Sequence, residues 1–329
     1  MVQGTRNLSG LLDADNVLPA LVRWRRRGKR AVLVTLAGIE GPGPRPLGAQ
    51  MAVSEDGSYN GYLSGGCLEG AISIEAQAVI RAGQNRLVRF GRGSRYFDIA
   101  LPCGSGLDLY FDQALAMSTL EAMSRLTVAR RPFTLNTRLD DGTSAIGAPP
   151  AADVLGELNT RRDGDVFRRA YLPTPKLLLI GAGPALVAIA RLASITGLAL
   201  DILTPDDHAR RNLSDLGLEA MGLGTATLSP GTAPDRWTAA VLAFHEHDRE
   251  PPLLAEILRS PAFYIGALGN RRVHAERLAQ LSARGFVAHD LARLRPSLGL
   301  IPGAKSQATL AAGVVADILA EAKSRGFVD

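Results

Sequence analysis

The sequence of 329 residues contains only two cysteines, Cys67 and Cys103. Two thiols are too few for a disulfide framework, and without further ligands at metal-binding spacing they are a poor basis for a zinc site. No stretch approaches the roughly 18 apolar residues that a membrane span needs. The opening residues also lack the charged-then-apolar pattern of a secretory signal. We therefore expect a cytoplasmic protein with reduced thiols and no membrane association.

The sequence also lacks blocks of one charge, because its arginines are scattered over the whole chain. The net charge is only +5, although the pI is about 9.5. This pattern argues against nucleic acid as a partner and weakly favours an anionic ligand. Apolar residues make up 46% of the chain, which is ample for a buried core, and the length predicts two domains.

The first half predicts an α+β domain over residues 1–150. Hydrophobic periodicity places helices and strands in alternation, and Gly and Pro clusters separate them. The expected helices cover residues 18–27 and 68–82, and the expected strands cover 31–36, 51–53, 59–63, 86–90 and 107–111. Asp56-Gly57 marks a hairpin turn between two of these strands.

The second half predicts a doubly wound parallel sheet of the Rossmann type over residues 176–329. Residues 151–175 mix Pro, Ala, Asp and Arg with little periodicity and are interpreted as a linker. Apolar strands at 177–180, 198–203, 238–244 and 263–268 then alternate with helices, the last at 307–323.

The most specific local motif is Ser64-Gly65-Gly66-Cys67-Leu68-Glu69-Gly70. If Ser64 caps the following helix, Cys67 is its third residue, and the peptide dipoles favour a thiolate there, although Glu69 opposes this. Two interpretations stay open. Cys67 is either a nucleophilic or metal-ligating thiolate facing a ligand held by glycine N–H groups, or a small buried side chain in a tight turn.

Two further loops of the first half bear candidate ligand groups. Cys103 stands beside Gly104, where bare backbone lets a ligand approach, and the two thiols either converge or are buried separately. Arg45 stands in a proline-rich loop and has two interpretations. Its planar guanidinium either binds phosphate or a pterin edge, or is a solvated loop side chain. Arg89, Arg92 and Arg95 are either attractors of an anion or plain surface charge.

In the second half, Gly181 and Gly183 place N–H groups and a helix N-terminus where a phosphate can bind. The dinucleotide fingerprint is incomplete, because Leu186 replaces its third glycine and Asp206 comes two residues late for the ribose acid. NAD(P) binding is therefore doubtful, and a Rossmann fold kept as scaffold is the alternative.

Polar groups also follow the later strands. His245 and His247 lie after a strand, where they either bind a metal, titrate near neutrality or form a plain polar loop. Arg271 and Arg272 give a helix a basic start, and Lys305 adds a point charge at another strand-to-helix turn.

Taken in order, these pieces resemble the XdhC/CoxI family. The resemblance rests on residues 41–51 (GPGPRPLGAQM), the Ser64–Gly70 motif, the Cys103-Gly104 loop, Gly181-Ala182-Gly183, His245-Glu246-His247, residues 264–272 (YIGALGNRR) and Gly303-Ala304-Lys305-Ser306. Each piece is weak alone, but the ordered set covers nearly the whole chain and is specific.

The resemblance implies a maturation factor rather than an enzyme. It would bind molybdenum cofactor, protect it while a cysteine desulfurase installs the terminal sulfido ligand, and deliver it to an apo molybdenum hydroxylase such as xanthine dehydrogenase. Carried over, Cys67 and Cys103 become thiols that handle the molybdenum or its sulfur. A homodimer is left open. The cofactor-binding residues expected on this basis are Arg45, Gly65, Gly66, Cys67, Glu69, Cys103, Gly104, Gly181, Gly183, His245, His247, Arg271, Arg272 and Lys305.

Two other classes of function compete with this interpretation. One is an NAD(P)-dependent oxidoreductase with a reactive thiol, and the other is an interaction protein that binds no small molecule. If the chaperone interpretation holds, the two halves should share one cofactor, with thiols from the first half and the phosphate turn from the second.

Overall fold

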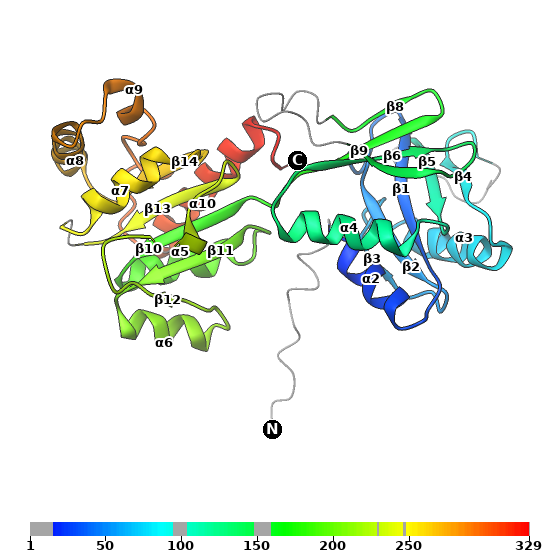
Figure 1. Ribbon diagram of the computed structural model, residues 1–329, viewed down its shortest axis with the longest axis horizontal. Coiled ribbons are helices and arrows are strands. Elements are labelled where there is room, and N and C mark those ends of the chain that lie inside the picture. The colour runs from blue at the N-terminus through cyan, green and yellow to red at the C-terminus, as the bar shows by residue number, and fades with distance from the viewer. Residues whose placement is uncertain (1–15, 95–103, 148–158, 229, 246–247, 329) are drawn as a thin grey trace. The chain divides into compact units, whose positions relative to one another are not determined.

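The computed structural model describes residues 16–94, 104–147, 159–228, 230–245 and 248–328 (Figure 1). The chain forms two compact units that divide between Pro173 and Thr174. Each unit has its own hydrophobic core and is described by itself.

The first unit is built on two antiparallel sheets. The larger has the strand order β3-β2-β1-β5-β4 and the smaller has the order β7-β6-β9-β8. The strands are β1 (Ala31–Glu40), β2 (Gln50–Ser54), β3 (Tyr59–Asn60), β4 (Arg86–Gly91), β5 (Gly106–Asp112), β6 (Phe133–Arg138), β7 (Ser144–Gly147), β8 (Arg161–Asp163) and β9 (Val166–Tyr171), and the helices are α2 (Leu18–Arg26), α3 (Glu69–Ala82) and α4 (Met117–Val128).

The central strand β1 explains why the first unit is layered. Its side chains alternate between two faces, and both faces are buried. Val32 and Val34 pack towards α3 in one core cluster. Leu33 packs on the other face with Leu21 of α2 and Leu120 of α4. The large sheet therefore lies between α3 on one side and α2 with α4 on the other.

Most expected elements of the first half are present, and the Asp56-Gly57 hairpin is confirmed by the antiparallel pairing of β2 and β3. The interpretation of residues 151–175 as a linker is wrong where β8 and β9 lie, because both strands belong to the smaller sheet. Phe167 of β9 is buried, whereas its neighbours Arg168 and Arg169 are only half-buried. Strand β8 is exposed throughout and β9 has only this one fully buried residue, so the arginine-rich stretch shows too little periodicity to be recognised.

The second unit carries a parallel five-stranded sheet with the order β12-β11-β10-β13-β14, which confirms the expected doubly wound fold. Its strands are β10 (Lys176–Gly181), β11 (Ala199–Thr204), β12 (Met221–Gly222), β13 (Thr238–Ala243) and β14 (Tyr264–Ala267), and its helices are α5 (Gly183–Ala193), α6 (Asp207–Asp215), η2 (Pro230–Thr232), α7 (Glu250–Arg259), α8 (Arg271–Ala283), α9 (Ala288–Leu291) and α10 (Gln307–Ser324).

Strand β10 separates the two layers of this unit. Leu177 and Leu179 pack in one cluster with residues of α5, α6 and α10. Leu178 and Ile180 pack in the opposite cluster with residues of α7 and α8. Because the sheet is covered on both faces, β10 and β13 are almost entirely apolar, whereas β11 contains Asp201, which pairs with Lys176 at 2.6 Å.

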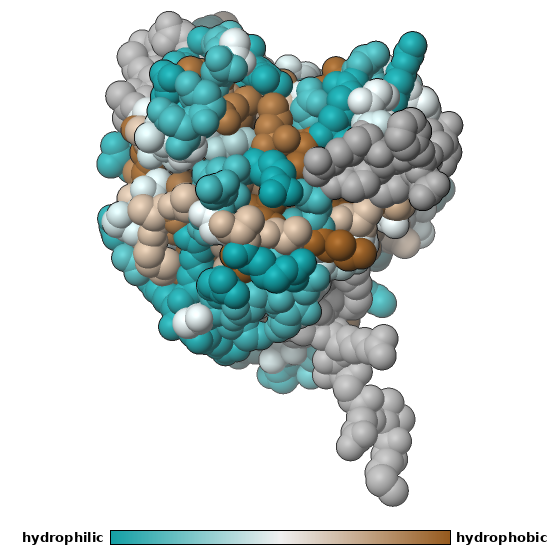
Figure 2. Space-filling model, turned by 90° about the vertical axis from the view of Figure 1, so that its right-hand side faces the viewer, coloured by the Kyte–Doolittle hydropathy of each residue, from teal (hydrophilic) through white to brown (hydrophobic). Residues whose placement is uncertain are grey.

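A search of the described residues finds no helix with the length and apolar character required to cross a membrane. Figure 2 looks onto the side of the molecule where α3 and β8 lie in Figure 1, and on this side apolar residues reach the surface among hydrophilic ones.

Candidate functional site

Three loops of the first unit meet at one end of the large sheet. Strand β1 ends at Glu40, opposite Gly106 at the start of β5. The 41–49 loop after β1 returns into β2, and β3 leads from the same end into the 61–68 loop. The Ser105 hydroxyl donates a hydrogen bond to the Pro42 carbonyl, which fixes the segment after Cys103 against the proline-rich loop. The topology thus brings together segments that are distant in sequence.

The 61–68 loop is organised around the carboxylate of Glu69, which is 2% exposed. One oxygen accepts hydrogen bonds from the Leu63 and Ser64 amides at 3.0 and 2.9 Å. The other accepts from the Ser64 hydroxyl at 2.6 Å and from the Gly66 and Leu68 amides at 2.9 and 3.2 Å. One buried carboxylate therefore satisfies four amides and one hydroxyl of this loop.

Burial acts to raise the pKa of Glu69, but the hydrogen bonds from Ser64 and Leu63 outweigh it and hold the pKa of this carboxyl below its ordinary value. Glu69 was expected among the cofactor ligands. In the structure its oxygens face the loop amides, so that its contribution is to fix the loop on which Cys67 stands.

The expected capping of the next helix by Ser64 is wrong. Helix α3 begins at Glu69, and the Ser64 hydroxyl accepts from the Leu68 amide at 2.8 Å without being the N-cap. Cys67 therefore precedes the helix and is not its third residue. The positive φ angles of Gly65 (76°) and Gly66 (116°) make the sharp turn that separates the strand from the helix.

Cys67 is exposed, so the interpretation of this residue as a buried side chain is wrong. Its Sγ lies 3.6 Å from the Ser64 carbonyl oxygen. A Cβ added at Gly65 or Gly66 would meet no atom within 4 Å, so the space above the turn is open. The thiol and bare backbone thus form a surface that an incoming molecule can approach closely.

Arginine side chains surround this end of the sheet. Arg45 is half-buried in the proline-rich loop. Arg169, which sequence reasoning missed, donates from Nε to the Gly48 carbonyl at 2.6 Å and lies 3.9 Å above the ring of Tyr171. Arg169 therefore holds the proline-rich loop against strand β9, and no local sequence pattern indicates this contact.

Arg89 forms ion pairs with Glu40 and, at 3.0 Å, with Asp108. These contacts favour the interpretation of Arg89 as structural charge over that of an anion attractor. Gly104 lies next to Ser105 with a φ of 68° and open space beside it. Cys103 and Arg95 lie outside the described residues.

In the second unit, the carboxylate of Asp206 binds the turn after β10, which the sequence did not suggest. Gly181 packs so closely on β13 that a Cβ there would overlap the Ala243 carbonyl. Gly183 has a φ of 76°, and its amide donates to Asp206 at 3.1 Å. Asp206 also caps α6 by accepting from two amides there, so this carboxylate bridges two helix N-termini. Hydrogen bonds from Ala209 and Gly183 hold the pKa of Asp206 below its ordinary value.

Of the other expected ligands of this unit, His245 follows β13 and the two arginines begin the helix after β14. The expectation that Lys305 lies at a strand-to-helix turn is wrong, because the loop after α9, and not a strand, leads into α10. His245 is exposed, and its Cδ2 lies 3.7 Å from the position of a Cβ on Gly183. Lys305 is exposed just before Ser306, which caps α10. Arg271 and Arg272 are exposed at the start of α8, where Arg272 pairs with Glu276 at 2.9 Å. His247 lies outside the described residues.

Neither unit offers a preformed metal site among the residues that the structure describes, since no three His, Cys, Asp or Glu side chains cluster there. A metal bound at Cys67 would accordingly have to bring most of its own ligands.

Comparison with known proteins agrees with the resemblance in the sequence. Residues 24–91 match the model of the XdhC and CoxI family, and residues 177–318 match the model of the XdhC Rossmann domain. The chain belongs to this family.

Relatives match along most of the chain. It is 34% identical over 307 residues to the molybdenum cofactor insertion chaperone PaoD of Escherichia coli, covering 93% of this chain and 88% of that protein. It is 25% identical to a probable xanthine dehydrogenase subunit of Bacillus subtilis, covering 88% of this chain and 93% of that protein. A crystal structure described as a xanthine dehydrogenase from Bacillus halodurans has the same fold, with a TM-score of 0.72, 20% identity and coverage of 94% and 96%.

Proposed function

We propose that this protein binds molybdenum cofactor and delivers it to a molybdenum hydroxylase of the xanthine dehydrogenase type. The relative in Escherichia coli is named an insertion chaperone for this cofactor, and the similarity extends over 93% of the present chain. The observation that carries the proposal is the exposed Cys67 thiol, held on a loop whose amides are fixed by the buried Glu69.

The chemistry of the cargo fits this end of the sheet. Its metal end is rich in sulfur, and a thiolate is the side chain that soft metal centres prefer. The open turn at Gly65 and Gly66 lets the cargo approach the backbone, and Arg45 supplies a planar donor for the pterin edge or for phosphate. Because the loop is already fixed, little ordering entropy is lost on binding.

We also propose the partners that this role requires, namely an apo hydroxylase that receives the cargo and a cysteine desulfurase that sulfurates it, in the cytoplasm. The exposure of Cys67 is what a sulfur donor or a receiving enzyme needs, since a buried thiol could contact neither.

The decisive experiment is purification from a cofactor-producing host, followed by molybdenum and pterin analysis of the wild type and of Cys67→Ser. We expect at least about a tenfold loss of bound pterin in the variant, because the thiol is the only soft ligand of its loop. Ser73→Ala, on the following helix, is the matched control and should keep the full content. Unchanged pterin in a folded Cys67→Ser protein would contradict the role of the thiol.

We propose that the second unit binds the phosphate group of molybdenum cofactor through the exposed side chains of His245 and Lys305. Lys305→Ala should weaken retention of the cofactor, whereas Lys323→Ala, also exposed but near the opposite end of α10, should not. Equal retention in the two variants would remove the second unit from the binding site.

The geometry at Asp206 weighs against the oxidoreductase alternative. Its carboxylate occupies the Gly183 amide, and a dinucleotide diphosphate bound at that amide would face a like charge. Added NADH should therefore neither bind nor be oxidised. Asp206→Asn removes the charge and should strengthen binding of inorganic phosphate at the turn. Turnover of NADH by the wild type would promote the alternative.

A further inference from the structure

The first unit has a second surface feature, which lies between α2 and α4. Their buried faces pack through residues such as Leu21, Leu120 and Met123. Beside this contact lies an open groove of about 440 Å³, here called the α2/α4 groove, which is lined by Val22, Arg23, Arg26, Arg27, Ser124 and Val128 among others. Val128, the last residue of α4, is 85% exposed.

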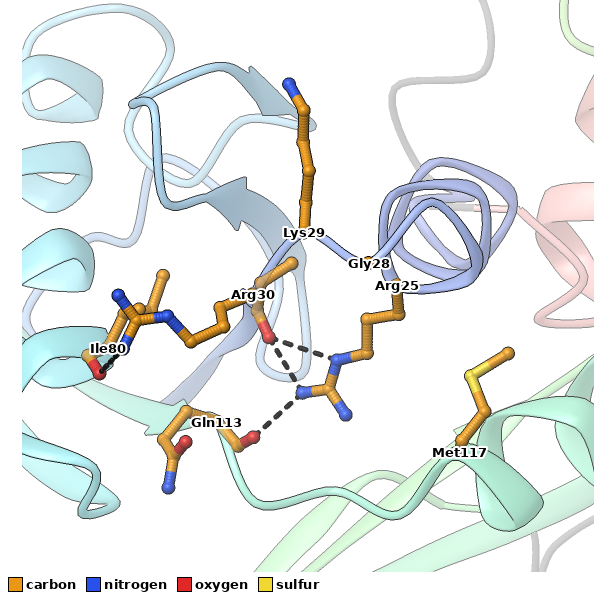
Figure 3. Close-up of a pocket in the computed structure, with 8 residues that line it drawn as sticks. Arg25, Gly28, Lys29, Arg30, Ile80, Gln113 and Met117 are labelled. Atoms are coloured by element: carbon orange, nitrogen blue, oxygen red, sulfur yellow. Dashed lines mark hydrogen bonds between the residues drawn. The ribbon is translucent and has the colours of Figure 1, made fainter.

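The charge around this groove is unbalanced. Helix α2 and the turn after it contain Arg23, Arg25, Arg26, Arg27, Lys29 and Arg30, and no acidic residue. Four of these six cations have partners within the unit. Arg25 donates to the Ala31 carbonyl at 3.1 Å and to the Gln113 carbonyl at 2.9 Å, in a separate pocket where Lys29 and Arg30 point away from it (Figure 3).

Three of the remaining cations reach carboxylates. Arg26 pairs with Glu121 at 3.1 Å, and Lys29 and Arg30 pair with acidic residues of the β2–β3 turn. Arg23 and Arg27 reach no carboxylate in the part of the chain that the structure describes. Both line the α2/α4 groove, so the groove combines an apolar floor with two uncompensated positive charges at its rim.

We infer that the α2/α4 groove docks an acidic amphipathic helix of a protein partner. The apolar side chains of such a helix would cover the exposed Pro19 and Val128, and its acidic side chains would meet Arg23 and Arg27. Nucleic acid offers charge but no apolar side chains for the floor of the groove. A flat bilayer cannot follow a concave floor between two helices, and the apolar face of α2 itself is buried in the core. The inference does not depend on the cargo bound at Cys67.

The test uses the full chain and a labelled synthetic peptide of roughly 15 residues, about the length at which an isolated helix becomes marginally stable. The peptide has Leu along one face and Glu beside it. One control peptide has Ser in place of Leu, and another has Lys in place of Glu. We expect the Leu/Glu peptide to bind and both control peptides to bind at least about tenfold more weakly.

Variants of the chain assign the binding to the groove. Charge reversal in Arg23→Glu/Arg27→Glu, and separately Val128→Asp, should each lower the affinity for the Leu/Glu peptide by about tenfold or more. The double variant should in return gain affinity for the Leu/Lys peptide. Arg81→Glu, an exposed arginine near the end of α3, is the matched control and should bind as the wild type does. Circular dichroism checks that each variant is folded.

Other outcomes overturn the inference. Equal binding of the Ser/Glu peptide would mean that only charge is recognised. Tighter binding of anionic phosphatidylglycerol vesicles or of duplex DNA, lost in the same variants, would assign the groove to that surface instead. A dimeric wild type that Val128→Asp converts to monomer would show that a second copy of the chain covers the groove.

Discussion

Replacing Glu69 by Gln tests whether one carboxylate holds the thiol-bearing loop together. The amide keeps the size of the side chain but turns one acceptor oxygen into a donor. That donor then faces either the Leu63 and Ser64 amides or the Gly66 and Leu68 amides. At least two hydrogen bonds to a charged acceptor are lost, each worth about 1.5–3 kcal/mol. Because Gly65 and Gly66 are exposed, water can satisfy part of the loop, and we expect a net loss of about 2–4 kcal/mol.

The two tryptophans allow this loss to be assigned to one unit. Trp24 lies in the first unit and Trp237 in the second. Urea unfolding followed by fluorescence in a Trp237→Phe background reports on the first unit, and in a Trp24→Phe background on the second. Glu69→Gln should shift only the Trp24 transition. Glu55→Gln, which breaks a surface ion pair with Arg30 at 3.1 Å, is the control and should cost less than about 1 kcal/mol.

The effect should also depend on pH with a fixed sign. Since the folded pKa of Glu69 lies below its ordinary value, its stabilisation is present above that ordinary value and disappears as the pH falls towards the folded pKa. The difference between wild type and Glu69→Gln should therefore shrink in acid. A loss below about 1 kcal/mol at neutral pH, or an equal shift of both tryptophan transitions, would refute the role given to this carboxylate.

Three further predictions concern the cores. Arg277→Met leaves Glu250 buried without its 2.6 Å ion pair and should cost about 3–5 kcal/mol, read from the Trp237 transition. Gly181→Ala should destabilise the second unit by about 1–3 kcal/mol, because the new methyl group meets the Ala243 carbonyl; an unchanged urea midpoint would contradict the close packing seen there. Burial raises the pKa of Tyr110 to about 12, so in an ultraviolet titration this residue should ionise at higher pH than an exposed tyrosine. The stability that neutral Tyr110 contributes should be lost as the pH rises past 10 towards 12. Tyr110→Phe should remove both effects.

The fold could be predicted where burial imposes a simple period on the sequence. Leu177 to Ile180 form a continuous apolar run because β10 is covered on both faces, and its neighbour β13 shows the same pattern. Strands β8 and β9 could not be predicted, because β8 is exposed throughout and β9 is held by pairing with β6 and by packing on the other sheet. Phe167 is buried beside Tyr110 and Ala37, which belong to the other sheet.

The site was predictable in its residue types but less so in its geometry. The glycines and the thiol of the 61–68 loop are local features, and the sequence motif identifies them directly. The clamp between Arg169 and Gly48 joins residues that are 121 positions apart, and nothing in either local sequence indicates it. The capping role expected of Ser64 is wrong because this residue resembles an N-cap in the sequence, whereas its hydroxyl bonds to both the Glu69 carboxylate and the Leu68 amide.

In both glycine turns, a carboxylate of the chain binds amides that the local sequence pattern would assign to a ligand. In each, a glycine with a positive φ stands just before a helix or at its first residue, and the amides of the turn suggest a cradle for an anion. In each, a carboxylate of the chain already occupies amides of the turn, from Glu69 in the first unit and from Asp206 in the second. In the sequence alone, Glu69 directly after the first turn and Asp206 soon after β11 count against a site for an anionic ligand, because each adds negative charge. In the structure both acids are part of the turn itself.

This arrangement bears on how a carrier can release its cargo. An amide that only a ligand satisfies becomes unsatisfied when the ligand leaves, at about 1–3 kcal/mol for a buried group. The amides bound to Glu69 are satisfied within the chain, so that release of the cargo leaves none of them without a hydrogen-bond partner. Affinity for the cargo must then come from groups that need no ligand to stay in place, such as the exposed Cys67 thiol and the guanidinium of Arg45. Such a site suits a protein that must hold a molecule and then transfer it, which is the function proposed for this chain.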